Sequence, residues 1–225
     1  NYGYHFTQWS DGNTDNPRII QITKDSTLTA VFDKNTYTVS ANANFEDRGT
    51  ITGAGEYLYK ERAQISAAPE YGYNFVRWND GNTQRSRFLN VLSDTSFTAI
   101  FEPIVYRVTV GVAPGNTGRG TVVGGGNIAY KDSTTIKAFS LYGYHFYNWS
   151  DGSTDSIRTV EVLGNANYYA SFAPNQYTLN LSVADEAMGT IEGNGSYDYL
   201  TEVQIRANSK QGYFFSQWSD GNKDN

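Results

Sequence analysis

The feature that most constrains the fold of this chain is a nine-residue phrase that occurs four times. Its consensus is Tyr-x-Phe-x-x-Trp-Ser/Asn-Asp-Gly, and successive tryptophans are separated by 69, 71 and 69 residues. A phrase that recurs at a nearly constant period indicates a tandem array in which each period forms the same supersecondary unit. Two shorter motifs, Gly-Thr and Ala-x-Phe, recur with the same period.

The phase of the array predicts where its units begin and end. Each Ala-x-Phe motif is followed by a short linker, and two of the linkers contain a proline, Pro103 or Pro174, as domain boundaries often do. Because residues 210–225 repeat residues 1–16, we expect a piece of a longer array. We predict two complete units, 37–101 and 106–172, the C-terminal half of a unit at 1–32, and the N-terminal part of another at 177–225.

Within a unit, apolar and polar residues alternate as they do in half-buried strands, and no long helical period occurs. We therefore predict an all-β fold, a tandem array of small β-rich units of about 70 residues each. We expect residues 87–91 and 97–101 to form a hairpin with one apolar face, and Gly124–Gly126 to be a hairpin turn. Phe75 and Trp78 are three residues apart, so both face inward only if a bulge or a strand end lies between them.

Composition excludes several kinds of function. The chain has no Cys and only two His, which excludes thiolate chemistry and disfavours a histidine metal centre. Its net charge of −6 argues against nucleic acid and anionic membranes as partners, and no apolar run is long enough for a membrane helix. His5 and His145 share a repeat position that holds Asn74 and Phe214 in other copies, so it is not a catalytic position. We expect no enzyme activity and no cofactor.

The recurring aromatic side chains are the first candidate site. A core residue must recur in every copy of the fold, whereas a binding residue need not, so we expect these side chains to form the core. The alternative is that the tryptophans are platforms for stacking sugars, which requires exposed indole faces. The side chains are Phe6, Trp9, Phe75, Trp78, Phe146, Trp149, Phe215 and Trp218.

The loop after each tryptophan is the second candidate site, because its alternating carboxylates and amides superficially resemble a calcium loop. The second copy carries Arg85 where a cation would lie, and no copy has the bidentate glutamate of the known motif. We therefore favour an Asp-Gly turn with the carboxylate accepting from backbone amides, and we predict no metal site. The weak candidate ligands are Asp11, Asn13, Asp15, Asp151 and Asp155.

Taken together, the motifs Tyr-Thr-Val, Gly-Thr-Ile/Val-x-Gly, the tryptophan phrase and Ala-x-Phe resemble the divergent internalin-type B-repeat of bacterial surface proteins, a Listeria–Bacteroides-type repeat. The resemblance covers nearly the whole chain as two full and two partial copies. It implies a small β-grasp-like unit used as a stalk, spacer or adhesion module of a secreted or cell-surface protein, without catalysis. The loop from Pro114 to Arg119 is longer than in the other full copy.

Further expectations accompany this resemblance. Three Asp-Ser-Thr/Ile motifs are similar to short O-glycan acceptors on exported Bacteroidetes proteins, although each is also an ordinary turn sequence; their serines are Ser26, Ser133 and Ser156. We expect neighbouring repeats to be the main partners, with 177–225 of one chain meeting 1–32 of the next head to tail. The alternative function is a module that binds a surface glycan or host protein through recurring aromatics.

Overall fold

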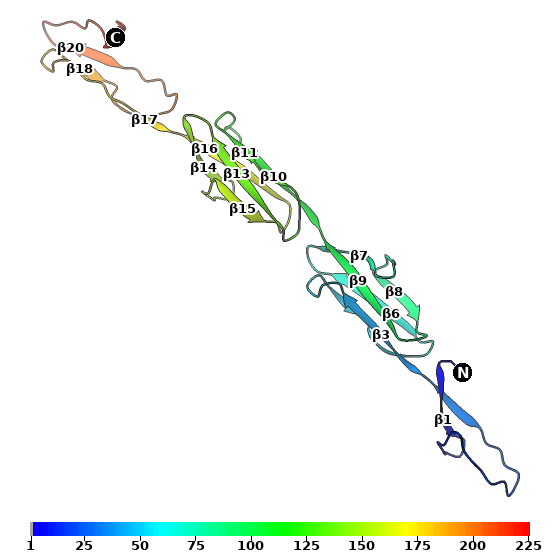
Figure 1. Ribbon diagram of the computed structural model, residues 1–225. Helices are drawn as coiled ribbons and strands as arrows, with labels where there is room; N and C mark the ends of the chain where they lie inside the picture. Colours follow the sequence, from blue (N-terminus) through cyan, green and yellow to red (C-terminus); the bar gives the residue numbers. More distant parts are fainter. Residues whose placement is uncertain (1) are drawn as a thin grey trace. The chain divides into compact units, whose positions relative to one another are not determined.

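The computed structural model describes residues 2–225, which form strands and loops but no helix (Figure 1). Accordingly, no helix in this part of the chain has the length and apolar character to cross a membrane. The predicted all-β fold of small repeated sheets is confirmed. The chain divides into two compact units, 1–105 and 106–225, and each contains one complete and one partial repeat.

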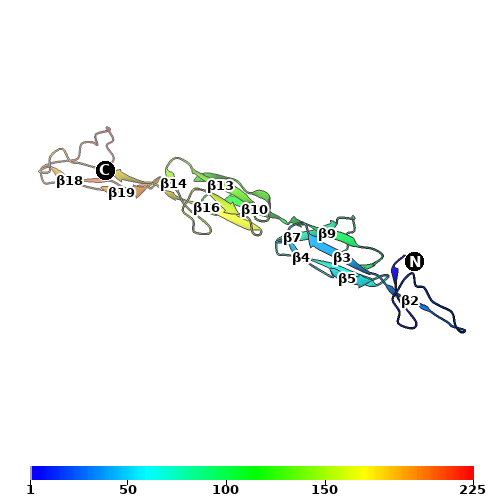
Figure 2. The ribbon, with the colours of Figure 1, turned by 60° about the horizontal axis from the view of Figure 1, so that its bottom comes forward.

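The first complete repeat consists of two sheets (Figure 2). The four-stranded sheet has the order β5-β3-β9-β7, with β3 and β9 parallel, and the three-stranded sheet has the order β4-β6-β8. All other neighbours are antiparallel. The strands are β3 (Thr36–Ala43), β4 (Gly49–Thr52), β5 (Gly55–Leu58), β6 (Arg62–Pro69), β7 (Tyr73–Trp78), β8 (Ser86–Asn90) and β9 (Thr95–Pro103).

The second complete repeat has the same arrangement. Its four-stranded sheet has the order β12-β10-β16-β14, with β10 and β16 parallel, and its three-stranded sheet has the order β11-β13-β15. Identical topology from two different sequences means that the shared motifs carry the fold. The strands are β10 (Val105–Val112), β11 (Gly120–Val123), β12 (Gly126–Ala129), β13 (Ser133–Ser140), β14 (Tyr144–Trp149), β15 (Ile157–Glu161) and β16 (Ala166–Pro174).

The two partial repeats contain fewer strands, and three of these strands are shorter than their counterparts. The N-terminal partial repeat is one antiparallel pair, and the C-terminal partial repeat is two antiparallel pairs. The strands are β1 (Tyr4–Trp9), β2 (Ala30–Lys34), β17 (Gln176–Leu179), β18 (Gly189–Glu192), β19 (Gly195–Asp198) and β20 (Arg206–Ser209).

The core of each complete repeat lies between its two sheets. In the second, Ile136 and Ala138 from β13 pack with Trp149, Ala170 and Phe172 from the other sheet, and each is at most 5% exposed. The inward-facing residues alternate with more exposed ones along the strands, as expected for sheets with one face in water. The recurring Gly-Thr motif has its explanation here, because a Cβ atom at Gly120 would lie 2.2 Å from the Phe172 ring. The equivalent distance from Gly49 to the Phe101 ring is 2.4 Å.

Both predicted hairpins are wrong. Strand β8 pairs with β6 and strand β9 pairs with β3 and β7, so residues 87–91 and 97–101 lie in different sheets. Their apolar residues face the core from two sheets: Leu89 from β8, and Phe97, Ala99 and Phe101 from β9. At the crossing, Asp94 accepts a hydrogen bond of 2.7 Å from the backbone amide of Thr38, which belongs to the parallel partner of β9. Gly124–Gly126 likewise connects β11 in one sheet to β12 in the other.

The predicted irregularity between Phe75 and Trp78 is confirmed. The register of β7 against β9 shifts between Phe75 and Arg77, and the same shift occurs in β1 and β14. One extra residue lets both aromatic rings face the core. Their centroids are 5.7 Å apart at an interplanar angle of 63°.

Candidate functional site

Each tryptophan closes the loop that follows it. The indole Nε1 of Trp78 donates to the carbonyl of Gln84 at 2.9 Å, and its backbone amide donates to the carbonyl of Asn82 at 2.8 Å. The same pair of hydrogen bonds occurs at the other three tryptophans. Trp78 and Trp149 have no exposed surface, whereas Trp9 and Trp218 are partly exposed in the partial repeats. The four phenylalanines of the phrase are half-buried.

The carboxylates of these loops have internal partners. Asp11 forms a bidentate ion pair with Arg18 at 2.8 Å, and Asp80 and Asp151 pair with the arginine seven residues later. A side-chain oxygen of each aspartate also accepts from a backbone amide two residues on, as expected of an Asx turn. Within residues 2–225 no group of three His, Cys, Asp or Glu side chains is placed to hold a metal ion.

The arginines shift the titration of these carboxyls. The hydrogen bond from Arg18 lowers the pKa of Asp11. Partial burial acts to raise the pKa of Asp80 and of Asp151, but the hydrogen bonds from Arg87 and Arg158 and from the backbone outweigh it, so both are lowered. The remaining weak metal candidates serve the loops: Asn13 bonds Asp15, and the Asp155 carbonyl accepts from Trp149.

The strongest candidate for a functional site is the junction between the N-terminal partial repeat and the first complete repeat. The backbone amide of Asn35, in the linker, donates to the carbonyl of Gly3 at 2.9 Å, and the Asn35 carbonyl accepts from the amide of Tyr59 at 2.8 Å. The Asn35 side chain also bonds His5, at 3.0 Å, and the Tyr37 hydroxyl. The linker is therefore hydrogen-bonded to both of the repeats that it joins.

Four tyrosines surround this linker. Tyr59 is 8% exposed and is in edge-to-face contact with Tyr2, Tyr4 and Tyr37, with ring centroids 5.5–6.3 Å apart. Gly3 has a φ of +81°, and a Cβ atom there would lie 2.3 Å from the Tyr59 ring. Only glycine combines this backbone conformation with such close contact.

The same junction recurs before the C-terminal partial repeat. Asn175 bonds the Gly143 carbonyl and the Tyr199 amide, both at 2.8 Å, and its side chain bonds His145. A Cβ atom at Gly143 would lie 2.2 Å from the ring of Tyr199, which is also in contact with Tyr142, Tyr144 and Tyr177. The charge of Tyr177, and a hydrogen bond with it, raise the pKa of Tyr142.

The family model of the divergent InlB B-repeat domain matches four segments that cover almost the whole chain, at residues 1–36, 37–105, 108–176 and 179–225. The chain belongs to the divergent InlB B-repeat family. No curated protein and no solved structure matches it. The predicted resemblance is thereby confirmed, and the junctions lie where one B-repeat segment meets the next.

Sequence reasoning missed the tyrosine junctions of this B-repeat array. The signal was present: Tyr-Gly-Tyr occurs at 2–4, 71–73 and 142–144, and a further tyrosine recurs at 59, 130 and 199. The first tyrosine and the glycine lie outside the tryptophan phrase, which begins at the second tyrosine of the motif. The two histidines, which were judged non-catalytic, lie at the junctions as partners of Asn35 and Asn175.

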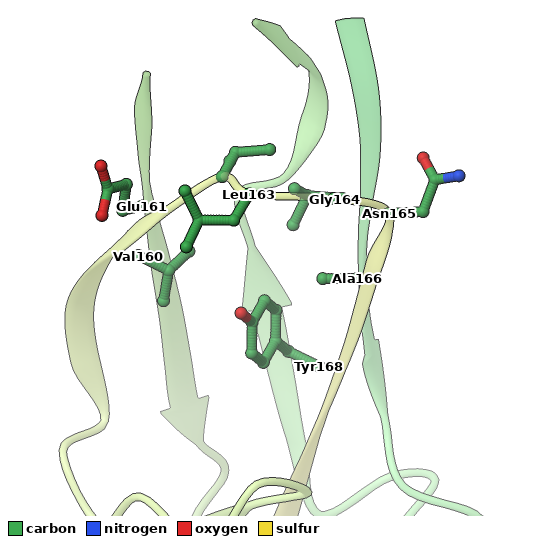
Figure 3. Close-up of a pocket in the computed structure, with 9 residues that line it drawn as sticks. Val160, Glu161, Leu163, Gly164, Asn165, Ala166 and Tyr168 are labelled. Carbon is green, nitrogen blue, oxygen red and sulfur yellow. The ribbon is translucent and has the colours of Figure 1, made fainter. Parts of the chain in front are cut away.

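The second complete B-repeat also has a pocket of about 280 Å³ beside the start of β16 (Figure 3). Val160, Leu163 and Tyr168 contribute most of its apolar wall, and Glu161 and Asn165 point outward at its sides. At the position equivalent to Leu163 in the first complete B-repeat, the Leu92 carbonyl accepts a hydrogen bond of 2.9 Å from Tyr2 of the preceding repeat. We assign no ligand to the pocket.

The serines of the Asp-Ser motifs have different surroundings. Ser26 and Ser133 are exposed, and Ser156 is partly exposed. The Ser26 hydroxyl donates to the Lys24 carbonyl at 3.0 Å, and Ser133 begins β13. Their O-glycosylation remains a prediction from the sequence.

Proposed function

We propose that this tandem B-repeat segment is a non-catalytic spacer of a bacterial surface or secreted protein, in which the tyrosine junctions limit bending between repeats. The family is typical of bacterial surface proteins, which supports the proposed location. The observation that carries the proposal is the contact of Tyr59 with Gly3, together with the two backbone hydrogen bonds of Asn35.

A spacer needs joints that resist bending, and a linker that is free of both neighbours supplies none. Here the linker is a single hydrogen-bonded residue, Asn35, between β2 and β3. Rotation at this joint separates the buried Tyr59 ring from Tyr2 and Tyr4, so bending exposes apolar surface and breaks hydrogen bonds. The same set of contacts recurs at Asn175, which supports a joint that is a repeated feature of the array and is not specific to one pair of repeats.

The burial of Trp78 and Trp149 weighs against the alternative of glycan binding through the recurring tryptophans. A stacking platform needs an open ring face, and these indoles have none. Adhesion through other side chains is a separate question, which the junctions do not address.

The proposal is tested by the width of a distance distribution across the joint. The chain has no cysteine, so Gln8→Cys and Glu56→Cys place two spin labels at exposed positions on either side of it. We expect a narrow distribution that broadens in Tyr59→Ala. Because Tyr59 is buried and its loss can destabilise the repeat, Tyr4→Ala provides a second variant that acts from the other side.

Phe88→Ala is the matched control, since Phe88 is an exposed aromatic on the outer sheet face whose ring packs against Arg62. It should leave the distribution narrow. A distribution that is already broad in the parent chain, or that stays equally narrow in both folded tyrosine variants, would refute the spacer mechanism.

A further inference from the structure

The outer face of the three-stranded sheet in the second complete repeat carries several exposed apolar side chains among polar ones, and the fold does not require them. Along β11, β13 and β15 the odd-numbered residues point away from the core. Val123, Lys137 and Ile157 form one cross-strand row, and Phe139 lies in the next row. Val123, Phe139, Leu141 and Ile157 are 47–59% exposed, and we call these four residues the apolar face.

The other repeats show that the fold does not require this face. At the equivalent positions the first complete repeat has Thr52, Ala68, Glu70 and Ser86, where Ser86 bonds Ser66 and Gln64. In the C-terminal partial repeat, the positions of Val123 and Phe139 are occupied by Glu192 and Asn208, which bond each other at 2.8 Å. The apolar residues therefore belong to this one repeat and not to the architecture.

The exposed aromatic rings on the outer sheet faces of the two complete repeats also have different neighbours. On the outer face of the first, the guanidinium of Arg62 lies 3.8 Å from the centroid of the Phe88 ring. In residues 2–225 no cation covers Phe139, although Lys137 projects from the same strand one row away. A ring and a cation that do not meet within one molecule are available to a second molecule.

We propose that a second copy of this chain covers the apolar face in a two-fold, isologous contact. An axis that lies in the interface, across the strands and between the rows of Lys137 and Phe139, places each Lys137 over the Phe139 ring of the other chain. Rows on one strand face are about 7 Å apart, so an axis midway between them brings the Lys137 row of one chain opposite the Phe139 row of the other. An axis through the Lys137 row instead opposes two ammonium groups and is disfavoured.

The size of the apolar face sets the strength of the contact. Four such side chains, each about half exposed, present on the order of 350 Å² of apolar surface, similar to the largest apolar patch of a typical monomer, which is often functional. Stable interfaces bury roughly 800 Å² on each partner, so we expect a weak dimer with a dissociation constant of about 0.1–1 mM. In a longer array that carries several such faces, parallel contacts would add through effective concentration.

The test is sedimentation equilibrium of the whole chain up to about 1 mM, the upper end of the expected dissociation constant. The key variant, Val123→Thr with Phe139→Ala and Ile157→Ser, installs the residues that the first complete repeat carries on the same fold. We expect its dissociation constant to rise by about tenfold or more, since it removes most of the apolar face. Lys137→Glu should also weaken the dimer, while circular dichroism remains unchanged in both variants.

The reciprocal variant, Thr52→Val with Ser66→Lys, Ala68→Phe and Ser86→Ile, is the matched control and should strengthen association by providing a second face. The partial repeats at the two ends are unchanged in every variant, so association that persists undiminished in the key variant belongs to the ends and overturns the proposal. A parent chain that is monomeric at about 1 mM overturns it as well. The spin-label experiment is done below the dissociation constant, so the spacer proposal stands or falls independently.

Discussion

The complete and partial repeats are built from the same motifs, yet three strands of the partial repeats are shorter than their counterparts. Strand β3 has eight residues and its counterpart β17 has four, and β9 has nine residues where β2 has five. The positions that lose strand structure in the partial repeats are those that pair with only one neighbouring strand in a complete repeat, and that neighbour is absent. Val39–Ala43 pairs with β9, and β17 stops at Leu179, the equivalent of Val39, because the C-terminal partial repeat has no such strand.

The same rule accounts for the other shortened strands. Residues 62–65 of β6 pair with β8, and β20 begins at Arg206, which is equivalent to Ser66. Residues 95–98 of β9 pair with β3, and β2 begins at Ala30, which is equivalent to Ala99. In this chain, the segments that form strands are therefore those whose pairing partners are present. Backbone groups that lack a ladder partner are left to water.

The sharpest way to break this comparison is to complete a partial repeat. Asn225 is equivalent to Ser156, so appending a copy of residues 157–174 supplies the strands that correspond to β15 and β16. We expect the segments 180–183 and 202–205 to become protected strands and Trp218 to become buried. The unfolding free energy of the completed repeat should be near the lower end of the usual range of about 5–15 kcal/mol.

Amide hydrogen exchange and the emission wavelength of Trp218 measure this change. A Gly/Ser extension of the same length is the control and should leave both unchanged. If the two extensions behave alike, the short strands are a property of the local sequence and the comparison fails.

The second prediction concerns the tryptophans. Trp78→Ala empties a site with no exposed surface, at which the expected loss is about 3–5 kcal/mol, comparable to the whole stability of a small repeat. Trp218→Ala, at the equivalent but partly exposed position, should cost clearly less. Urea unfolding followed by circular dichroism separates the two, and equal losses would contradict the comparison.

How far the fold could be predicted from the sequence depends on the range of the contact. The tryptophan phrase and its bulge were predictable because their constraints lie within a few residues, as in the shift between Phe75 and Arg77. The partner of β9 was not predictable from its neighbours. Its amides pair with β3, more than fifty residues earlier, while a short loop to β8 suggested a hairpin.

The tyrosine junctions could not be predicted from the sequence for a different reason. Tyr59 lies in the middle of one repeat, and Gly3 lies in the preceding one, so no local pattern links them. The copies nevertheless share a pattern, because a glycine between two tyrosines precedes a further tyrosine by 56 residues at both Gly3 and Gly143. That observation predicts a contact but not its geometry.

The third prediction concerns the packing of the Gly-Thr motif against the core of a complete repeat. Gly120→Ala in the second complete repeat places a methyl group against Phe172, and overpacking of this kind costs about 1–3 kcal/mol. Combining it with Phe172→Leu should recover part of that loss, relative to the sum of the single changes. Thermal unfolding of the four chains in this cycle gives the coupling. Strict additivity would show that the glycine is needed for another reason.

The last and smallest effect concerns a contact that should not distinguish complete from partial repeats, because it forms within seven residues. Asp80 pairs with Arg87 in the first complete repeat, as Asp11 pairs with Arg18 in the N-terminal partial repeat. The Asp80 side chain is 38% exposed, so solvent screening keeps the contribution of the pair at about 0.2–1 kcal/mol.

Since the pKa of Asp80 is lowered from 3.8, this stabilisation is complete at neutral pH and is lost as the pH falls through the native pKa. Arg87→Gln should therefore lower the urea midpoint slightly at pH 7 and have less effect at acidic pH, once the carboxyl becomes protonated in the native protein. Arg18→Gln should behave in the same way when the N-terminal partial repeat is followed by amide exchange. A loss confined to the complete repeat would mean that the ion pair depends on the surrounding sheets, and that even this local loop is set by long-range pairing.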